Sequence, residues 1–477
     1  MAFDSLDYKS VLNLLRGSKI YWILLIALVL RLGMCLYVCV ANPDAAFCPD
    51  SYSYHALGVN LLQNHSFSLS GSAPFKPNLF RPPGYPLMIA IIYAIFGIRP
   101  VFVIIFQIVL SVLTIAMIYK LGMILFNRRS GLLAASLLTI EPTSIYYSNV
   151  LTAETLFTFV LVCFVFLMVR IAMNVEEHTI NKVLIASSLL AIAALIKYVS
   201  YYLSIPVGIG LLVYLSRNVS LRKTVVCFFV FALAQLLIIG SWQMRNYTKT
   251  GHWELTATPA SDLFLRAASV IAAKNGISFD EAWQQLRQNL LNDGEFSELN
   301  EIERFNVENK RGLEIIKEYP WTYAKLYAGG ILKMFAEPGM TSVMILFGLH
   351  QPGSGLLGKI GFNRYLLEYV IDHKVLLIFN STGLAYLILV YASFVIGLKS
   401  SFNFVTKENH FIFISILFLL GLIFYFALMA QTESYSRFRS PIMPYIILFA
   451  GYGLYHGLSV QTGGIGKSKM NTGQKSQ

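Results

Sequence analysis

Residues 20–41 read IYWILLIALVLRLGMCLYVCVA, an apolar run that contains a single charged side chain, Arg31. A helix of about 20 apolar residues crosses the ~30 Å hydrocarbon layer of a bilayer, and only helices or closed barrels satisfy the backbone there. Lys9, Arg16 and Lys19 precede the run and no small-residue cleavage site clearly follows it. We therefore expect a retained first transmembrane helix with a cytoplasmic N-terminus.

The composition of the whole chain extends this prediction to an all-α polytopic membrane protein. Of 477 residues 56% are apolar and 13% are charged, which is outside the soluble globular range. The net charge of +12 comes mainly from Lys and Arg in the short connections between apolar runs, so membrane topology explains it and no nucleic-acid partner is expected. The five cysteines form neither a disulfide framework nor a CxxC metal pattern.

Two basic connections, 127–130 and 216–223, belong on the cytoplasmic side and fix the threading of the chain. The apolar segment 83–97 is too short to span, so we expect it to lie along the membrane interface. Residues 326–349 contain Pro338 and fit either an interfacial or broken helix or a plain span. About ten spans follow, at 20–41, 100–126, 130–147, 153–172, 183–198, 201–215, 224–240, 375–397, 410–430 and 441–458.

This threading divides the chain into four parts. Residues 1–240 form an N-terminal transmembrane module with a first outer loop at 42–99, and the polar, amphipathic region 241–325 forms a helical cap on the outer face. Residues 326–458 form a second transmembrane module, and 459–477 form a cytoplasmic tail that we expect to be disordered. The absence of an evident internal repeat weakens a transporter built from inverted halves.

The first outer loop holds the residues best suited to chemistry. Asp50 lies in Cys48-Pro-Asp-Ser-Tyr-Ser-Tyr, and Arg81 opens Arg81-Pro-Pro-Gly-Tyr-Pro about thirty residues later. A partly buried carboxylate can act as a general base, and a guanidinium can hold an anion next to it. The alternatives are that Asp50 caps a helix and that Arg81 only fixes the proline turn. Asp44 competes for the base role but lies at the end of the first helix.

Further ionisable residues converge on the outer edge of the membrane, where an unpaired charge is costly and is a functional candidate by default. Arg245, Arg437 and Arg439 are suited to bidentate phosphate binding. Lys197 offers a point charge, or else anchors a helix end at the headgroups. Arg31, inside the first span, is expected to face the bundle interior. Around Asp50, the side chains predicted to contact a sugar or acceptor are Tyr52, Tyr54, His55 and Tyr85.

Glu154 opens the fourth predicted span on the outer face. It compensates the helix dipole, or it holds the acceptor or a divalent cation, Mg²⁺ or Mn²⁺, together with Asp50. Two carboxylates are too few to name the metal. The chain contains no GxxxxGK[ST], no GxGxxG on a strand and no HExxH, so no nucleotide cofactor is expected.

With these residues placed, the chain resembles the polyprenyl-phosphate-sugar-dependent glycosyltransferases of the C-type (GT-C) fold, in the group of protein O-mannosyltransferases and lipid A aminoarabinose transferases. The likeness covers roughly residues 20–250 well and extends weakly to Arg245-Asn-Tyr and Arg437/Arg439. It rests on Asp50, Tyr54-His-Ala-Leu-Gly-Val-Asn-Leu-Leu, Arg81-Pro-Pro-Gly-Tyr-Pro-Leu, Phe96-Gly97, 121–129 and Glu154.

The resemblance implies roles for these residues. Asp50 would be the catalytic base, Glu154 would assist with a metal or the acceptor, and Arg81 with the outer basic residues would hold the donor phosphate. Many relatives carry two adjacent acids in this loop, whereas Ser51 follows Asp50 here, which weakens the metal assignment. Lipid A transferases often carry Lys in the loop-one proline motif, where this chain has Phe80-Arg81-Pro-Pro-Gly-Tyr. We therefore do not transfer lipid A as a substrate to this chain.

The predicted function is inverting transfer of a sugar from an undecaprenyl- or dolichyl-phosphate donor to an acceptor hydroxyl. The partners are this lipid-linked donor, a glycan, lipid or protein acceptor, and membrane lipids. The site would lie on the outer or periplasmic face of the cell membrane. One alternative is a non-catalytic flippase or exporter of lipid-linked saccharides, which predicts no essential carboxylate. Another is a ligase that moves a whole glycan from a diphosphate lipid.

Overall fold

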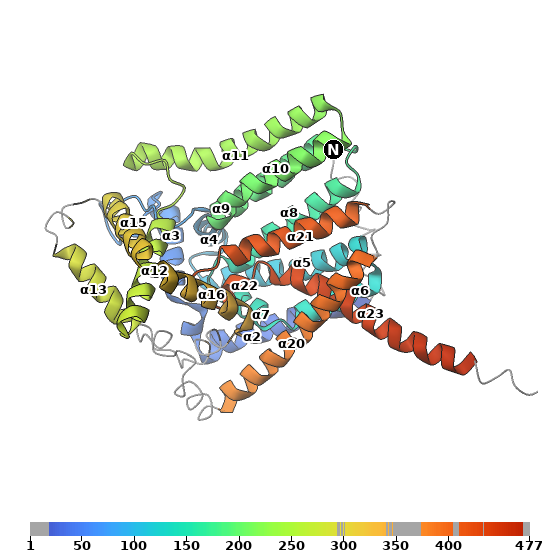
Figure 1. The fold of residues 1–477 in the computed structure, drawn as a ribbon. Coiled ribbons are helices and arrows are strands. Elements are labelled where there is room, and N and C mark those ends of the chain that lie inside the picture. The colour runs from blue at the N-terminus through green and yellow to red at the C-terminus, as the bar shows by residue number, and fades with distance from the viewer. Residues whose placement is uncertain are drawn as a thin grey trace, which may run out of the picture.

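The computed structural model is helical throughout the residues it describes, and no strand occurs among them (Figure 1). Eight of the helices are long and apolar enough to cross a membrane, which confirms the polytopic all-α fold class. The structure describes residues 19–292, 296, 299, 301–339, 342, 346, 374–403, 410–432 and 434–470. The eight helices are α2 (Lys19–Ala41), α5 (Pro100–Leu125), α8 (Glu154–Met173), α9 (Thr179–Ile196), α10 (Val199–Asn218), α11 (Leu221–Thr250), α20 (Lys374–Asn403) and α21 (His410–Leu428).

The predicted span at 130–147 was wrong, because the chain breaks there into α6 (Arg128–Thr139) and α7 (Pro142–Ser148). Pro142 has no N–H to continue a helix ladder. Directly before it, the Glu141 carboxylate accepts a hydrogen bond from the Ser144 N–H at 2.5 Å and so caps α7. The apolar pattern alone does not show this break.

Arg31 is fully buried in α2 and faces the bundle interior, as predicted. Its guanidinium donates to Ser111 Oγ at 2.8 Å, to Ser144 Oγ at 2.9 Å and to the carbonyls of Ala27 and Thr139 at 3.2 Å. It therefore joins α2 to α5, α6 and the start of α7.

The C-terminal helices pack at very short range. A Cβ at Gly397 of α20 would lie 1.9 Å from the Phe449 carbonyl oxygen of α23 (Met443–Met470). Only glycine allows this approach of two backbones. α23 begins at residue 443, two residues into the predicted span 441–458. It continues as helix through 459–470, where the sequence predicted the start of a disordered tail. Residues 471–477 lie outside the described residues.

The polar region after α11 forms a compact cap at one end of the bundle (Figure 1). Its helices share a small apolar core that includes Phe264, Leu286 and Ile315. α16 is not among the candidate spans, and most of 340–349 lies outside the described residues. The cap helices are α12 (Thr258–Asn275), α13 (Phe279–Leu291) and α15 (Glu301–Glu318), and α16 (Pro320–Ala336) follows them.

The first outer loop folds into a short 3₁₀ helix η1 (Pro43–Ala46), then α3 (Pro49–Asn64) and α4 (Gly84–Phe96). α4 has 13 residues, fewer than the about 20 that a span needs. This length fits the predicted interfacial segment. Gly84 allows α4 to pack closely against α9. A Cβ at this position would lie 2.8 Å from the carbonyl oxygen of Leu195 and 2.9 Å from the carbonyl carbon.

Gly84→Ala is expected to lower the stability of the protein by about 1–3 kcal/mol, because the added methyl meets backbone that cannot rotate away. The thermal midpoint of the purified protein in detergent measures this. Gly71→Ala is the matched control, since nothing lies within 4 Å of a Cβ at that position. Equal midpoints for the two variants would contradict the close packing of α4 on α9.

Candidate active site

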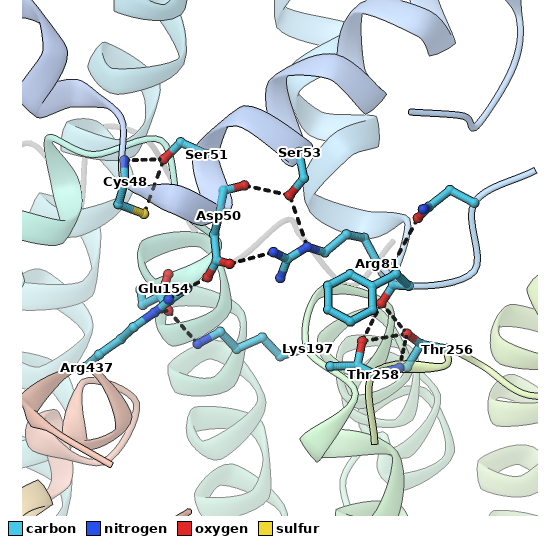
Figure 2. A network of polar contacts seen from close by, with 12 residues as sticks. Cys48, Asp50, Ser51, Ser53, Arg81, Glu154, Lys197, Thr256, Thr258 and Arg437 are labelled. Atoms are coloured by element: carbon cyan, nitrogen blue, oxygen red, sulfur yellow. Dashed lines mark hydrogen bonds and ion pairs between the residues drawn. The ribbon is translucent and has the colours of Figure 1, made fainter. Parts of the chain in front are cut away.

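Five charged side chains from five separate parts of the chain meet beside the start of α3 (Figure 2). We call them the charge network. They are Asp50 in the first turn of α3, Arg81 in the loop before α4, Glu154 as the first residue of α8, Lys197 between α9 and α10, and Arg437 in α22 (Ser436–Arg439).

Arg437 is the centre of the charge network. Its NH1 donates to Asp50 Oδ2 at 2.5 Å, and its Nε donates to Glu154 Oε1. The Arg81 NH2 donates to the other oxygen of Asp50 at 2.5 Å, and Lys197 Nζ donates to Glu154 Oε1 at 2.8 Å. Each carboxylate is thus held between two cations, and one guanidinium links the two carboxylates.

Burial makes these contacts strong and leaves one end of the network open. The Glu154 side chain is 1% exposed, whereas Asp50 is 26% exposed. Ions removed from water need close partners. The Oε2 atom of Glu154 is buried without a hydrogen-bond partner among the described residues. Asp50 is therefore the carboxylate that a bound molecule can reach, and Glu154 is the deeper anchor.

Three cations and two carboxylates leave the charge network with one net positive charge. Burial raises the pKa of Asp50, but Arg437 and Arg81 outweigh it and hold the pKa of this carboxyl well below its usual range. Burial lowers the pKa of Arg437, while Glu154 and Asp50 keep it well above its usual value. These shifts keep Asp50 and Arg437 charged at neutral pH, while burial lowers the pKa of Lys197 against the opposing effect of Glu154.

Arg81 is positioned from several sides. Its Nε donates to Ser53 Oγ at 3.1 Å, and its guanidinium lies 4.8 Å from the ring centroids of both Tyr54 and Phe80. Its backbone N–H donates to Asn78 Oδ1 at 3.1 Å. The guanidinium thus has a fixed direction toward Asp50, and its role exceeds that of a turn-former.

Asp50 does not cap α3, which was the alternative to a role in catalysis. Cys48 is the N-cap of α3, and the Ser51 hydroxyl accepts from the Cys48 N–H at 3.0 Å. The Asp50 carboxylate points to the two guanidiniums instead. Asp44 lies in η1, apart from the charge network.

Other predicted site residues lie outside the charge network. Arg439 is 1% exposed, and its NH1 donates to the carbonyls of Met334, Phe335 and Glu337 at 2.8–3.0 Å. Arg245 donates to Asn246 Oδ1 at 3.0 Å and lies over the Trp242 ring. Both guanidiniums fix neighbouring chain segments in this structure.

The predicted aromatic contacts divide by exposure. Tyr52 is exposed, whereas Tyr54 lies buried beneath Arg81. Tyr85 is fully buried and donates to Gln107 Oε1 at 2.5 Å. His55 Nδ1 lies 2.8 Å from the Tyr93 hydroxyl, and burial lowers the pKa of this histidine. Tyr52 is therefore the tyrosine of this group most open to a bound molecule.

Sequence reasoning missed the side chains that join the cap to the site. Thr256, just before α12, and Thr258, its first residue, both donate to the Phe80 carbonyl next to Arg81 (Figure 2). Asp262 of α12 accepts from the Tyr198 hydroxyl and, at 2.6 Å, from Gln431. A Thr-x-Thr-Pro helix start is common, so no sequence signal marks these contacts.

The two carboxylates do not fit the divalent metal site that the sequence left open. Arg437 occupies the position between Asp50 and Glu154, so a cation that bridged them would have to displace it. Within the described ranges, no group of three His, Cys, Asp or Glu side chains could hold a metal ion. We derive no step through a metal.

The fold is that of a multi-pass membrane protein, with the charge network beside the start of α3. Residues 80–242 match the family model described as dolichyl-phosphate-mannose-protein mannosyltransferase, a glycosyltransferase family. The match contains Arg81, Glu154 and Lys197 of the charge network. It confirms, over about a third of the chain, the resemblance to polyprenyl-phosphate-dependent glycosyltransferases. A comparison with the sequences of curated proteins found no match.

Solved structures with a similar arrangement include two of the oligosaccharyltransferase of Archaeoglobus fulgidus. The complex of AglB with an inhibitory peptide and dolichol phosphate is 15% identical, has a TM-score of 0.47 and covers 96% of this chain and 52% of that one. The complex with Zn and sulfate is 12% identical, with a TM-score of 0.49 and coverages of 93% and 49%. ArnT from Cupriavidus metallidurans bound to undecaprenyl phosphate is 13% identical, with a TM-score of 0.40 and coverages of 91% and 78%. The chain spans about half the length of the archaeal proteins.

Proposed function

We propose that this protein transfers a sugar from a polyprenyl-phosphate donor to an acceptor hydroxyl on the outer face of the cell membrane, with inversion at the anomeric carbon. The observation that carries the proposal is the chain of contacts from Arg81 through Asp50, Arg437 and Glu154 to Lys197. It holds a candidate base directly against groups that bind phosphate. The family match and the membrane fold support the same class of reaction.

The net charge of the network favours a monophosphate donor. A sugar linked to a lipid through one phosphate is a phosphodiester with a single negative charge, which balances the one net positive charge. A diphosphate-linked glycan carries a second negative charge. Guanidinium groups bind phosphate oxygens bidentately, and Arg437 and Arg81 present two of them within one site.

Donor binding also explains how a strongly paired carboxylate can act as a base. The phosphate oxygens compete with Asp50 for Arg437 and Arg81, so the bound donor releases Asp50 from one or both ion pairs. The acceptor O–H then gives its proton to Asp50, and its oxygen bonds to the anomeric carbon. The bond from that carbon to the phosphate oxygen breaks, and its electron pair leaves with the polyprenyl phosphate. Arg437 and Lys197 stabilise the added negative charge.

An apolar cavity provides a place for the isoprenoid tail. It has a volume of about 560 Å³, lies between α8, α10 and α21, and is lined by residues such as Met168, Pro206 and Phe424. Tyr425, which also lines it, donates to the Val199 carbonyl at 2.5 Å, two residues from Lys197. α8 carries Glu154 at its first residue. The α8 residues that line the cavity begin at Met168, so the end of the cavity at Tyr425 is the part near Lys197, and we propose that the donor phosphate enters the charge network from there.

This release makes a prediction about pH dependence. In the free enzyme the pKa of Asp50 lies well below its usual range, so kcat/KM should keep its full value down to low pH. With donor bound, the guanidiniums face phosphate and the pKa of Asp50 rises. As pH falls, kcat should therefore decline before kcat/KM does. Steady-state kinetics with the donor varied gives kcat and kcat/KM at each pH. If both declined over the same acidic pH range, donor-induced release of Asp50 would be contradicted.

The proposal is tested directly with purified protein reconstituted into sealed proteoliposomes. Polyprenyl-phosphate sugars, supplied as a panel with one radiolabelled sugar each, are incubated with total envelope glycans, lipids and proteins from the source cells as acceptors. We expect label transfer and release of polyprenyl phosphate from one monophosphate donor and none from a diphosphate-linked glycan. Movement of label across the bilayer without cleavage of the donor would instead show the flippase.

A further inference from the structure

A second cavity lies on the cap side of the charge network, between the start of α10, the end of α11 with the loop that follows, and α15. Its volume is about 420 Å³. We call it the aromatic cavity. The lining residues that matter here are Tyr201, Tyr202, Trp253, Phe305, Asn306 and Asn309.

The aromatic cavity adjoins the charge network on two sides. Its wall includes Leu79, two residues before Arg81, and Tyr198, directly after Lys197. The Ala257 N–H donates to the Leu79 carbonyl at 2.8 Å, and Phe305 stacks on Phe80 at 6.3 Å between ring centroids. A molecule held in this cavity therefore lies beside the segments that carry both Arg81 and Lys197.

The lining combines aromatic faces with neutral amides. Gln243, Asn306 and Asn309 offer both donors and acceptors next to five aromatic side chains. Among the described residues that line this cavity none is Lys, Arg or His, and Glu254 is the one carboxylate, with a side chain that is 60% exposed. A hexose ring has an apolar face of C–H groups and a rim of hydroxyls, and this lining matches both. A phosphorylated acceptor would need a cation in the lining, and an alkyl chain would leave the amides without partners.

Two parts of the lining are already held in place. The Trp253 ring stacks on the Tyr247 ring, with centroids 4.6 Å apart and planes at 18°. The backbone carbonyl of Trp253 accepts from Gln243 Nε2 at 3.0 Å. The Trp253 side chain is nevertheless 50% exposed. A rigid, half-exposed ring costs little conformational entropy when it binds a ligand.

We infer that the aromatic cavity binds a saccharide, and that this saccharide is the acceptor of the transfer reaction. The second half of the inference rests on the proposed function. In that reaction a hydroxyl of the bound saccharide faces Asp50, while the rest of the sugar chain lies between α10 and the cap. The acceptor class is then a neutral glycan, free or lipid-linked.

The test measures binding without catalysis. Saturation-transfer NMR and tryptophan fluorescence are recorded on the full-length protein in detergent with a panel of free di- to tetrasaccharides of neutral hexoses and N-acetylhexosamines. A serine- and threonine-containing hexapeptide and undecaprenyl phosphate are the competing probes. We expect at least one saccharide to bind and the peptide to give no signal. A panel without any binding saccharide, or a peptide that binds in its place, would overturn the inference.

Variants then locate the saccharide. Trp253→Ala and Asn309→Leu should each weaken binding about tenfold or more, the loss of one stacking or hydrogen-bonding partner. Trp321→Ala is the control, because Trp321 lies on α16, is 80% exposed and does not line the cavity. Unchanged binding in both cavity variants would reject this location.

Asp50→Asn separates this inference from the proposed function. It should abolish transfer and leave saccharide affinity within twofold of the parent protein. If saccharides do not bind but transfer still depends on Asp50, only the acceptor assignment fails. If a saccharide binds in the cavity but no donor is cleaved, the proposed function fails and the binding site stands.

Discussion

Asp50→Asn is expected to lower sugar transfer by orders of magnitude while the protein still inserts and folds, with some loss of stability because Arg81 and Arg437 each lose a charged partner. The amide matches the carboxylate in size, but its single carbonyl oxygen can accept from only one of Arg81 and Arg437, which contact Oδ1 and Oδ2 of Asp50 at 2.5 Å each. It cannot take the proton of an acceptor hydroxyl. Loss of a general base typically costs 10²–10⁴-fold, so we expect kcat to fall by about that factor.

The measurement is release of polyprenyl phosphate from the monophosphate donor, with size-exclusion profile and thermal midpoint as checks of folding. Asp44→Asn is the matched control, because it removes a carboxylate from the same loop but outside the charge network. A variant at Asp50 that retains full transfer would remove the enzymatic proposal and favour a flippase.

The sequence predicted those parts of the fold that depend on local pattern. Apolar length and basic connections predicted most of the spans, and α4 is as short as expected. The break at Pro142 was missed because residues 130–147 have the composition of one span, and the Glu141 cap shows only in three dimensions. The sequence also indicated Asp50 and Glu154 as candidate site residues, because both are carboxylates at the predicted outer edge of the membrane.

The sequence could not predict which basic residue joins the two carboxylates. Arg437 and Arg439 are two residues apart, yet one contacts Asp50 and Glu154 and the other binds three carbonyls. The direction of each side chain is fixed by the four-residue helix α22 and its packing. Contacts that span 387 and 283 residues leave no local pattern in one sequence.

The same limit applies to the cap. Its helices were expected from their amphipathic patterns, but the side chains that attach it to the site were not. Thr256 and Thr258 reach the Phe80 carbonyl, and Asp262 reaches Tyr198 and Gln431. Hydroxyls and a carboxylate near a helix start have ordinary local roles, so their tertiary role appears only when α10 and the cap are placed together.

Arg437→Met should both abolish transfer and destabilise the protein. Methionine replaces the aliphatic stem of the side chain but removes the two contacts that hold Asp50 and Glu154. Glu154 is 1% exposed and would keep only Lys197 as a partner. Removal of one partner from a buried ion pair typically costs about 3–5 kcal/mol. Thermal and denaturant unfolding in detergent measure the loss of stability.

A double variant separates this charge effect from simple loss of packing. Glu154→Gln added to Arg437→Met removes the unpaired negative charge, so the pair should recover part of the stability that Arg437→Met loses. Transfer should stay absent in the pair, because the phosphate still lacks its guanidinium. Arg437→Lys keeps the positive charge and should retain part of the stability, but it should lose donor affinity, since an ammonium lacks the planar fork that binds phosphate oxygens bidentately. Full transfer in Arg437→Lys would mean that the donor phosphate binds elsewhere.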